Sequence, residues 1–221
     1  MNAYPTIDYW GQNLGLKIFA FDKIDGSNIR VEYSQKRGFY KFGTRKMMID
    51  EKNEPFGFVI DLFMKKYEPL IKIFKSKDYR NSLSYVCYLE LAGEKSEFGS
   101  HDFKNDKTIT LTLFDIEDVR KNEFIVPKNF IKHFGEEVDI PRVVYNGNLN
   151  KEFIQQVKEN KLDSGLLVEG CVCKGIISNR KDSALFMCKI KTNDWFDRLR
   201  KTGNQELIEE EINQQNLFCN Q

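Results

Sequence analysis

Lysine residues occur at two places in the chain where their spacing suits chemistry. Lys23 begins the run Lys-Ile-Asp-Gly-Ser-Asn (23–28), while Lys189 and Lys191 lie two residues apart near the C-terminal end. A lysine amine is a nucleophile only when neutral, and its ordinary pKa of about 10.4 makes that form scarce at pH 7. Each pattern also has a simpler interpretation. Asp25-Gly26 is typical of a tight turn, and Lys-Ile-Lys of a strand with one solvated face.

Further motifs follow Lys23 in a fixed order. They are Gly-Thr-Arg-Lys (43–46), Tyr-Leu-Glu-Leu-Ala-Gly (88–93), Leu-Phe-Asp-Ile (113–116), Glu-Gly-Cys-Val-Cys-Lys (169–174) and Lys-Ile-Lys (189–191). Each motif is weak alone, but the ordered series resembles the motif set of the covalent nucleotidyltransferases, which include polynucleotide ligases and mRNA capping enzymes. The resemblance runs from Lys23 to Lys191 and covers most of the chain. The sequence contains no GxxxxGK[ST], GxGxxG or HExxH signature.

The first motif separates the members of this superfamily. DNA ligases and capping enzymes typically read K-x-D-G-x-R, whereas position 28 here is Asn, preceded by Ser27. The form found here resembles that of the RNA ligases, especially the RNA ligase 2 group, which seals nicks in duplex RNA. A DNA ligase, a GTP-dependent guanylyltransferase and a nucleotide-binding module without catalysis are the alternatives.

The resemblance implies a reaction with three phosphoryl transfers. Lys23 would attack the α-phosphate of ATP, AMP would move from the lysine to an RNA 5′-phosphate, and a 3′-hydroxyl would displace AMP. Lys189 and Lys191 share one side of a predicted strand. By the resemblance they would contact the α-phosphate, and their positive charge would also favour the neutral amine of Lys23.

The other motif residues acquire nucleotide-binding roles through the same resemblance. Glu169 would bind Mg²⁺, for which Mn²⁺ could substitute, and Mg²⁺ commonly takes only one or two protein carboxylates. Glu90 would accept hydrogen bonds from the ribose hydroxyls, and Phe114 would stack on the purine. The alternative for Phe114 is one more core aromatic in a chain with 18 phenylalanines. The remaining residues expected to contact the nucleotide are Asp22, Asp25, Gly26, Asn28, Arg45 and Lys174.

Arg45 closes a basic stretch with interleaved aromatic residues. Lys36, Arg37, Lys41, Arg45 and Lys46 occur with no acidic residue between them. Such a pattern could follow an RNA backbone, and an exposed edge strand protected by lysines would have the same composition.

Composition limits the class of protein more than its chemistry. The chain has 221 residues, 41% hydrophobic residues and a formal net charge of +1, which is typical of a globular protein. Five cysteines form no paired framework, so we expect an intracellular, reducing setting. We expect Cys171 and Cys173 to be apolar packing residues, because no second metal-binding pair accompanies them. No apolar run is long enough to span a membrane, so no membrane partner is expected.

Strands and helices must place these motifs together. Alternation and turn signals predict strands over 16–21, 28–33, 38–43, 85–91, 108–116, 165–169 and 184–190. The first three read as a hairpin meander around Asp25-Gly26. Helical spacing predicts a helix over 55–76, interrupted at Pro69, and further helices over 151–160, 194–200 and 205–216.

The expected fold class is therefore α+β with mainly antiparallel sheet. The resemblance implies the nucleotidyltransferase fold, related to the ATP-grasp ligases: two antiparallel sheets flanked by helices, with ATP in the groove between them. We expect a nucleotidyltransferase domain over 1–191 and a short helical appendage over 192–221, which is too short for an OB domain.

The expected partner is RNA with 5′-phosphate and 3′-hydroxyl ends, as in a nicked duplex, and the role would be RNA repair. The chain would be either a minimal enzyme or the catalytic domain of a longer protein, and we expect modest sealing unless a partner or a preformed duplex positions the RNA ends.

Overall fold

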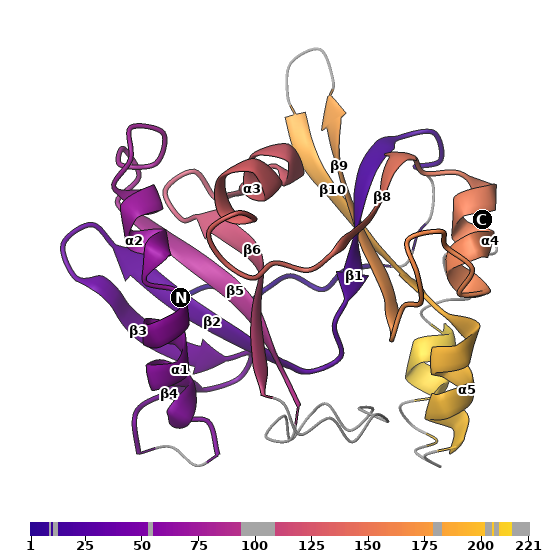
Figure 1. Cartoon of the computed structure of the whole chain (residues 1–221), viewed down its shortest axis with the longest axis horizontal. Coiled ribbons are helices and arrows are strands. Elements are labelled where there is room, and N and C mark those ends of the chain that lie inside the picture. Colours follow the sequence, from indigo (N-terminus) through magenta and orange to yellow (C-terminus); the bar gives the residue numbers. More distant parts are fainter. Residues whose placement is uncertain are drawn as a thin grey trace. The chain divides into compact units, whose positions relative to one another are not determined.

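The computed structural model describes residues 1–8, 10, 13–52, 55–93, 109–178, 183–201, 205 and 208–213. The chain forms two compact units (Figure 1). The first contains residues 1–5 and 26–140, and the second contains residues 6–25 and 141–221. The helices that follow Lys191 belong to the second unit.

The first unit is built on a six-stranded antiparallel sheet. Its strand order is β4-β3-β2-β5-β6-β7. The strands are β2 (Ser27–Ser34), β3 (Gly38–Thr44), β4 (Met48–Ile49), β5 (Ser84–Ala92), β6 (Thr110–Asp118) and β7 (Glu123–Phe124). Three helices accompany the sheet: α1 (Phe58–Lys66), α2 (Pro69–Phe74) and α3 (Pro127–Phe134).

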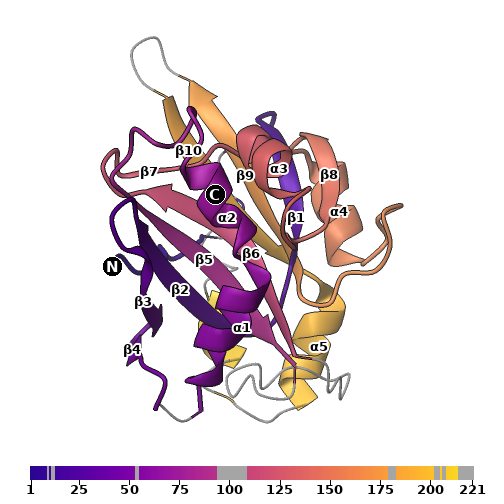
Figure 2. The same ribbon diagram turned by 60° about the vertical axis from the view of Figure 1, so that its left-hand side comes forward.

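Helices α1 and α2 lie along one face of this sheet (Figure 2). Aromatic rings fill the interface: Phe63 of α1 lies 4.8 Å from Phe39, and Phe74 of α2 stacks on Tyr85 at 4.5 Å between ring centroids. Pro69 occupies the first turn of α2, where its missing N–H costs nothing. The predicted interruption of the 55–76 helix at Pro69 is confirmed. The opposite face of the sheet carries the alternate residues of the strands, among them Asn28 and Glu90.

The second unit contains a four-stranded antiparallel sheet with the order β10-β9-β1-β8. Its strands are β1 (Lys17–Lys23), β8 (Val143–Asn148), β9 (Gly170–Ser178) and β10 (Ser183–Lys191). Helix α4 (Lys151–Lys158) begins at Asn150, whose side chain accepts a hydrogen bond from the Phe153 amide. Helix α5 (Asn193–Lys201) follows β10, and residues 208–213 are also helical.

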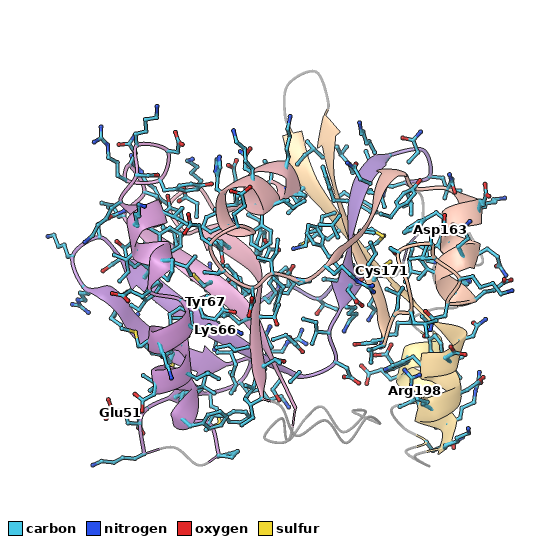
Figure 3. The ribbon with its side chains drawn as sticks, viewed as in Figure 1. Glu51, Lys66, Tyr67, Asp163, Cys171 and Arg198 are labelled. Atoms are coloured by element: carbon cyan, nitrogen blue, oxygen red, sulfur yellow. The ribbon has the colours of Figure 1, made fainter. Side chains whose placement is uncertain are left out.

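One face of this second sheet forms an apolar core with α4. The cluster comprises Ile18, Ala20, Val144, Leu149, Phe153, Ile154, Val157, Leu167, Cys171, Cys173, Cys188 and Ile190. Because side chains alternate along a strand, Lys23, Lys174, Lys189 and Lys191 lie on the opposite face. Cys171 and Cys173 are fully buried, which confirms their predicted packing role; Cys171 is labelled in Figure 3.

Two expectations about the strands were wrong. Strand β1 does not form a hairpin with β2: it pairs with β8 and β9, and β2 pairs with β3 and β5 in the other sheet. Residues 24–26 are therefore a connection between two sheets, which local turn propensity cannot distinguish from a hairpin turn. The strand expected over 165–169 is irregular, and β9 begins at Gly170.

The remaining expected elements within the described residues are present, with ends that differ by a few residues. Of the helix expected over 205–216, residues 205 and 208–213 are helical, and the other positions lie outside the described residues. The expected strands and helices did not include β4, β7, β8, β9 and α3. Strand β8 contains Asn146, Gly147 and Asn148, which locally favour turns, so its pairing with β1 prevails over propensity. Among the described residues, no helix has the length and apolarity that crossing a membrane requires.

Candidate active site

Strand register places the candidate nucleophile and one of the paired lysines on either side of the same glycine. In the order β1-β9-β10, Lys23 faces Gly170 and Gly170 faces Lys191. The three residues therefore form a row across one edge of the sheet: Lys23 and Lys191 are the last residues of β1 and β10, and Gly170 is the first residue of β9. Lys189 lies two residues earlier on β10 and shares the face of Lys191.

Glu169 bridges the two lysines at the ends of this row. Its Oε2 atom lies 2.5 Å from the Lys23 Nζ atom, and its Oε1 atom lies 2.9 Å from the Lys191 Nζ atom. The Glu169 and Lys191 side chains are each only 4% exposed, whereas that of Lys23 is 26% exposed. The nucleophile candidate is therefore the accessible member of a largely buried ion-pair network.

A second carboxylate completes the network from the C-terminal segment. The Glu211 Oε2 atom lies 3.0 Å from Lys191 Nζ and 4.0 Å from Lys189 Nζ. Within the ion pairs of the described residues, three ammonium groups thus face two carboxylates, one positive charge more than the negative ones. An anionic ligand at this face would meet a site of complementary charge.

Charge and burial shift the pKa values of two members of the network. Burial alone would raise the pKa of the Glu169 carboxyl, but the Lys23 and Lys191 ammonium groups outweigh burial and lower it. Burial is the largest cause that lowers the pKa of Lys189. The Glu211 carboxylate opposes that shift, and the positive charges of Lys191 and Lys23 add to it. Glu169 is therefore held as a carboxylate.

Gly170 allows the strands to approach closely enough for this geometry. A Cβ atom at position 170 would lie 2.0 Å from the Ile190 carbonyl oxygen, which is backbone of β10. No side chain fits there. The Thr192 amide donates to the Glu169 carbonyl at 3.0 Å and fixes the residue before Gly170 as well.

Lys174 lies on the same face as the lysine row, farther along β9. It is only 4% exposed, and its Nζ atom lies 5.3 Å from the centroid of the Phe21 ring. Lys174 faces Phe19 across β1 and Met187 across β10. Lys174 and Lys189 therefore lie on the same face of the sheet.

Asp22 lies apart from this lysine face. It precedes Lys23 on β1, so its side chain projects to the other side of the sheet. Its Oδ2 atom accepts a hydrogen bond from Arg142 at 2.9 Å, and Arg142 also donates to the Ser164 and Leu166 carbonyls. The structure brings Asp22 together with Arg142.

In the first unit, two candidate nucleotide-binding residues are direct partners across the sheet. Asn28 of β2 faces Glu90 of β5, on the face opposite α1 and α2. The buried Asn28 side-chain oxygen has no hydrogen-bond donor among the described residues. Gly26 precedes this pair, and a Cβ atom there would lie 2.2 Å from the Leu91 carbonyl oxygen. Only glycine fits at position 26.

Phe114 lies at an irregularity in the same sheet. Tyr88 pairs with Asp115 and Leu89 with Leu113, so Phe114 is the extra residue of a β-bulge. Bulges reorient side chains and are frequent next to active sites. The Phe114 ring is half-buried and meets Tyr4 edge to face at 4.9 Å. This partial burial is compatible with a core aromatic and with a ring that stacks on a base.

The remaining candidates lie in connections. Asp25 is half-buried in the segment between β1 and β2, and Arg45 is exposed in the turn between β3 and β4. The basic stretch is partly neutralised by its own sheet: Lys41 pairs with Glu32 at 3.2 Å, and Glu32 also accepts from the Tyr40 hydroxyl.

Sequence reasoning missed Glu211 and Trp195 as parts of the site. Trp195 holds the Lys191 Nζ atom 3.5 Å from its ring centroid, and Arg198, labelled in Figure 3, donates to the Val168 carbonyl. The helical pattern after Lys191 was recognisable, but its acidic composition suggested an appendage. Only the packing of these helices brings them to the lysines.

The donor chemistry of the site suits a hard divalent cation. Among the described residues no group of three or more His, Cys, Asp or Glu could hold a metal ion. Mg²⁺ needs only one or two protein carboxylates and keeps several waters, and Glu169 with Glu211 meets that requirement. Both Glu169 oxygens are engaged by lysines, so a cation would compete with Lys23 for this carboxylate.

Comparison of the chain with models of known protein families identifies its family. The model of the family described as RNA ligase matches residues 16–191. The chain therefore belongs to the RNA ligase family. No curated protein sequence matches it significantly.

Solved structures of an RNA ligase share the fold. The Naegleria gruberi RNA ligase with PPi has a TM-score of 0.58 at 18% identity, over 86% of this chain and 53% of that one. A mutant of that ligase with AMP and Mn has a TM-score of 0.58 at 18% identity, over 83% and 52%. Another mutant, with ATP and Mn, has a TM-score of 0.56 at 18% identity, over 83% and 51%. This chain thus spans about half the length of those proteins.

Proposed function

We propose that this chain is an ATP-dependent RNA ligase of the RNA ligase 2-like group, which joins 5′-phosphate and 3′-hydroxyl RNA ends through lysyl-AMP and RNA-adenylate. The observation that carries the proposal is the lysine row: an accessible Lys23 linked through Glu169 to the buried Lys191, with Lys189 on the same face. Membership of the RNA ligase family and the fold shared with a ligase solved with ATP and Mn support it.

In the first step the Lys23 Nζ lone pair attacks the α-phosphorus of ATP. A P–N bond forms, the bond to the pyrophosphate leaving group breaks, and Nζ releases one proton to solvent. The ion pair with Glu169 favours the ammonium form of Lys23. This pair must therefore open before attack, and the partial exposure of Lys23 allows that movement.

Lys189 and Lys191 provide the fixed positive charge that this transfer requires. Phosphoryl transfer depends on positioning and on stabilising charge at the phosphate oxygens. Lys191 is held by two carboxylates and is preorganised, so little reorganisation accompanies the reaction. Lys174, on the same face, would contact another phosphate.

Glu169 is the residue that would hold the divalent cation, with Glu211 as its neighbour in the network. When bound, Mg²⁺ or Mn²⁺ supplies positive charge that neutralises phosphate oxygens.

The nucleoside would be recognised by residues of the six-stranded sheet. Glu90 can accept hydrogen bonds from two ribose hydroxyls, and the half-buried Phe114 ring can stack on the base. The buried Asn28 oxygen suits a donor from the ligand, because buried polar atoms are rarely left unsatisfied. Asp25 and Gly26 would shape the connection after Lys23, Arg45 would orient a substrate phosphate, and Asp22 would act on the adenine side if it leaves Arg142.

In the later steps a 5′-phosphate oxygen of RNA attacks the AMP phosphorus and releases the lysine. The 3′-hydroxyl then attacks the activated 5′-phosphate, a phosphodiester forms, AMP leaves and the hydroxyl proton passes to solvent. A nicked duplex presents both ends side by side and reduces the entropy cost of this encounter.

Adduct formation tests the proposal directly. The chain is incubated with Mg²⁺ and α-labelled ATP and then denatured, alongside Lys23→Ala and the matched control Lys17→Ala from the same strand. Label on the wild type and on Lys17→Ala, lost in Lys23→Ala, is the expected result. Wild-type protein that binds ATP without becoming labelled would instead indicate a binding module.

Substrate preference separates the neighbouring activities. We expect ATP to be preferred over GTP as adduct donor, and a nicked RNA duplex over nicked DNA as acceptor. Preferential labelling by GTP would indicate a guanylyltransferase, and preferential sealing of DNA would indicate a DNA ligase.

A further inference from the structure

The ammonium group of Lys191 is packed against the face of an aromatic ring. Its Nζ atom lies 3.5 Å from the centroid of the Trp195 ring. The same atom contacts Glu169 at 2.9 Å and Glu211 at 3.0 Å. A cation over the face of an indole is attracted by the ring quadrupole, and this attraction grows when both groups are shielded from water. Lys191 is 4% exposed and Trp195 is 3% exposed, so the contact is of the shielded kind.

The start of α5 fixes the ring over the lysine. Thr192, directly after Lys191, accepts a hydrogen bond from the Trp195 amide through its hydroxyl at 3.1 Å and so caps the helix. The Thr192 amide donates to the Glu169 carbonyl. Thr192 thus links the end of β10, the start of α5 and Glu169. The first turn of α5 then places Trp195, four residues after Lys191, over the Lys191 side chain.

Trp195 is held from behind by an apolar cluster. The cluster consists of Trp195, Phe196, Leu199 and Ile208, with Ile212 packed against it. It attaches the helical residues 208–213 to α5, which also places Glu211 beside Lys191. The position of the Trp195 ring is therefore fixed by the apolar cluster and not by its contact with Lys191.

We propose that Trp195 is a positioning residue for Lys191, holding its ammonium group at the place where the transferred phosphate is neutralised. The inference rests on the proposed function for the role of Lys191, but Trp195 itself lies beyond residues 16–191 of the family match. The helices after Lys191 are thus part of the catalytic apparatus rather than an appendage.

Tryptophan fluorescence tests the contact without any reaction. The chain has two tryptophans, so Trp10→Phe leaves Trp195 as the sole reporter. In that background we expect Lys191→Met to change the emission of Trp195. The matched control Lys189→Met removes a charge of the same network two residues earlier on β10 and should change the emission much less. Equal spectra for the Lys191→Met and Lys189→Met proteins would overturn the proposal.

Adduct kinetics test the positioning. At saturating ATP, Trp195→Leu should slow lysyl-AMP formation roughly tenfold, the effect expected for loss of a shielded cation–π contact. Trp195→Phe, which keeps an aromatic face, should recover most of the rate. The KM for ATP should change less than kcat, since Lys191 acts on the transferring phosphate.

Phe196→Leu is the control for packing in the same cluster. It should lower the unfolding temperature about as much as Trp195→Leu without slowing adduct formation. If Trp195→Leu and Phe196→Leu slow the reaction equally, or if Trp195→Phe fails to restore the rate, Trp195 has only a packing role and the proposal is wrong.

The two proposals fail in different ways. A wild-type chain that forms no adduct would remove the proposed function, while the fluorescence comparison would still decide whether Trp195 holds Lys191. A wild-type chain that forms the adduct, with Trp195 variants that behave like Phe196→Leu, would remove only the inference about Trp195.

Discussion

The Glu169 carboxylate and the Lys191 ammonium form a 2.9 Å ion pair in which each side chain is 4% exposed. Removal of one member of a buried pair leaves an uncompensated charge and typically costs about 3–5 kcal/mol. Here the pair is extended to Lys23 on one side and to Glu211 on the other. The same groups that would handle a phosphate therefore also contribute to the stability of the second unit.

Acid should weaken this unit through Glu169. Its pKa in the folded protein is lowered from the ordinary value of 4.5, so the unfolded chain binds the proton more readily than the folded one. The stabilisation is present above pH 4.5 and disappears as the pH falls through the lower folded value. We expect the loss of unfolding free energy between pH 5 and pH 3 to be smaller in Glu169→Gln than in wild type, as measured by urea unfolding. Parallel pH profiles would contradict this ion-pair account.

The two paired lysines should be required for adduct formation. We expect Lys189→Ala and Lys191→Ala each to slow lysyl-AMP formation by roughly 10²–10³-fold, the range found when one preorganised charge-stabilising group is removed. Lys151→Ala, an exposed lysine at the start of α4, should leave the rate unchanged. Rapid labelling of either paired-lysine variant would show that the lysine face does not act on the phosphate.

Glu211 should oppose the binding of anions. Its carboxylate forms an ion pair with Lys191 at 3.0 Å and lies 4.0 Å from the Lys189 Nζ atom. A phosphate must therefore compete with Glu211 for these two lysines. Glu211→Gln keeps the shape and removes the charge, and we expect it to bind pyrophosphate severalfold more tightly in calorimetry. Glu209→Gln, an exposed control on the same segment, should bind like wild type. Weaker pyrophosphate binding by Glu211→Gln would indicate that this carboxylate supports the ligand instead.

Comparison with the neighbouring Phe124 can show whether Phe114 stacks on the base or is an ordinary core aromatic. Phe114 and Phe124 both contact Tyr4, at 4.9 and 5.4 Å between ring centroids, and both are half-buried. We expect Phe114→Ala to raise the KM for ATP about tenfold, since base stacking contributes roughly 1–3 kcal/mol. Phe124→Ala should reduce stability but leave the KM near the wild-type value. Equal KM values for the two variants would assign Phe114 to the core.

Gly26 should tolerate no side chain. A Cβ atom there would meet the Leu91 carbonyl at 2.2 Å, so Gly26→Ala must displace backbone next to Glu90. We expect a loss of about 2 kcal/mol or more in unfolding free energy. Gly38 has a positive φ of 71° and open space around it, so Gly38→Asn should be nearly neutral. Similar losses in the two variants would contradict the steric explanation.

The sequence by itself determined the motif residues, most strands and helices, and the family. Alternation in β10 was enough to put Lys189 and Lys191 on one face, and Pro69 was enough to divide a helix. These features depend on local periodicity and backbone chemistry, which can be read from neighbouring residues.

Tertiary structure alone decided how the motifs are joined. Asp25-Gly26 looked like a hairpin turn, yet β1 and β2 belong to different sheets, because strand partners are chosen by long-range packing and register. The Lys23–Gly170–Lys191 row joins Lys23 to two residues that lie more than 140 positions further along the chain. Trp195 and Glu211 reach Lys191 only because an apolar cluster attaches their helices to one another. No local pattern encodes such contacts, since their geometry arises when distant surfaces are buried together.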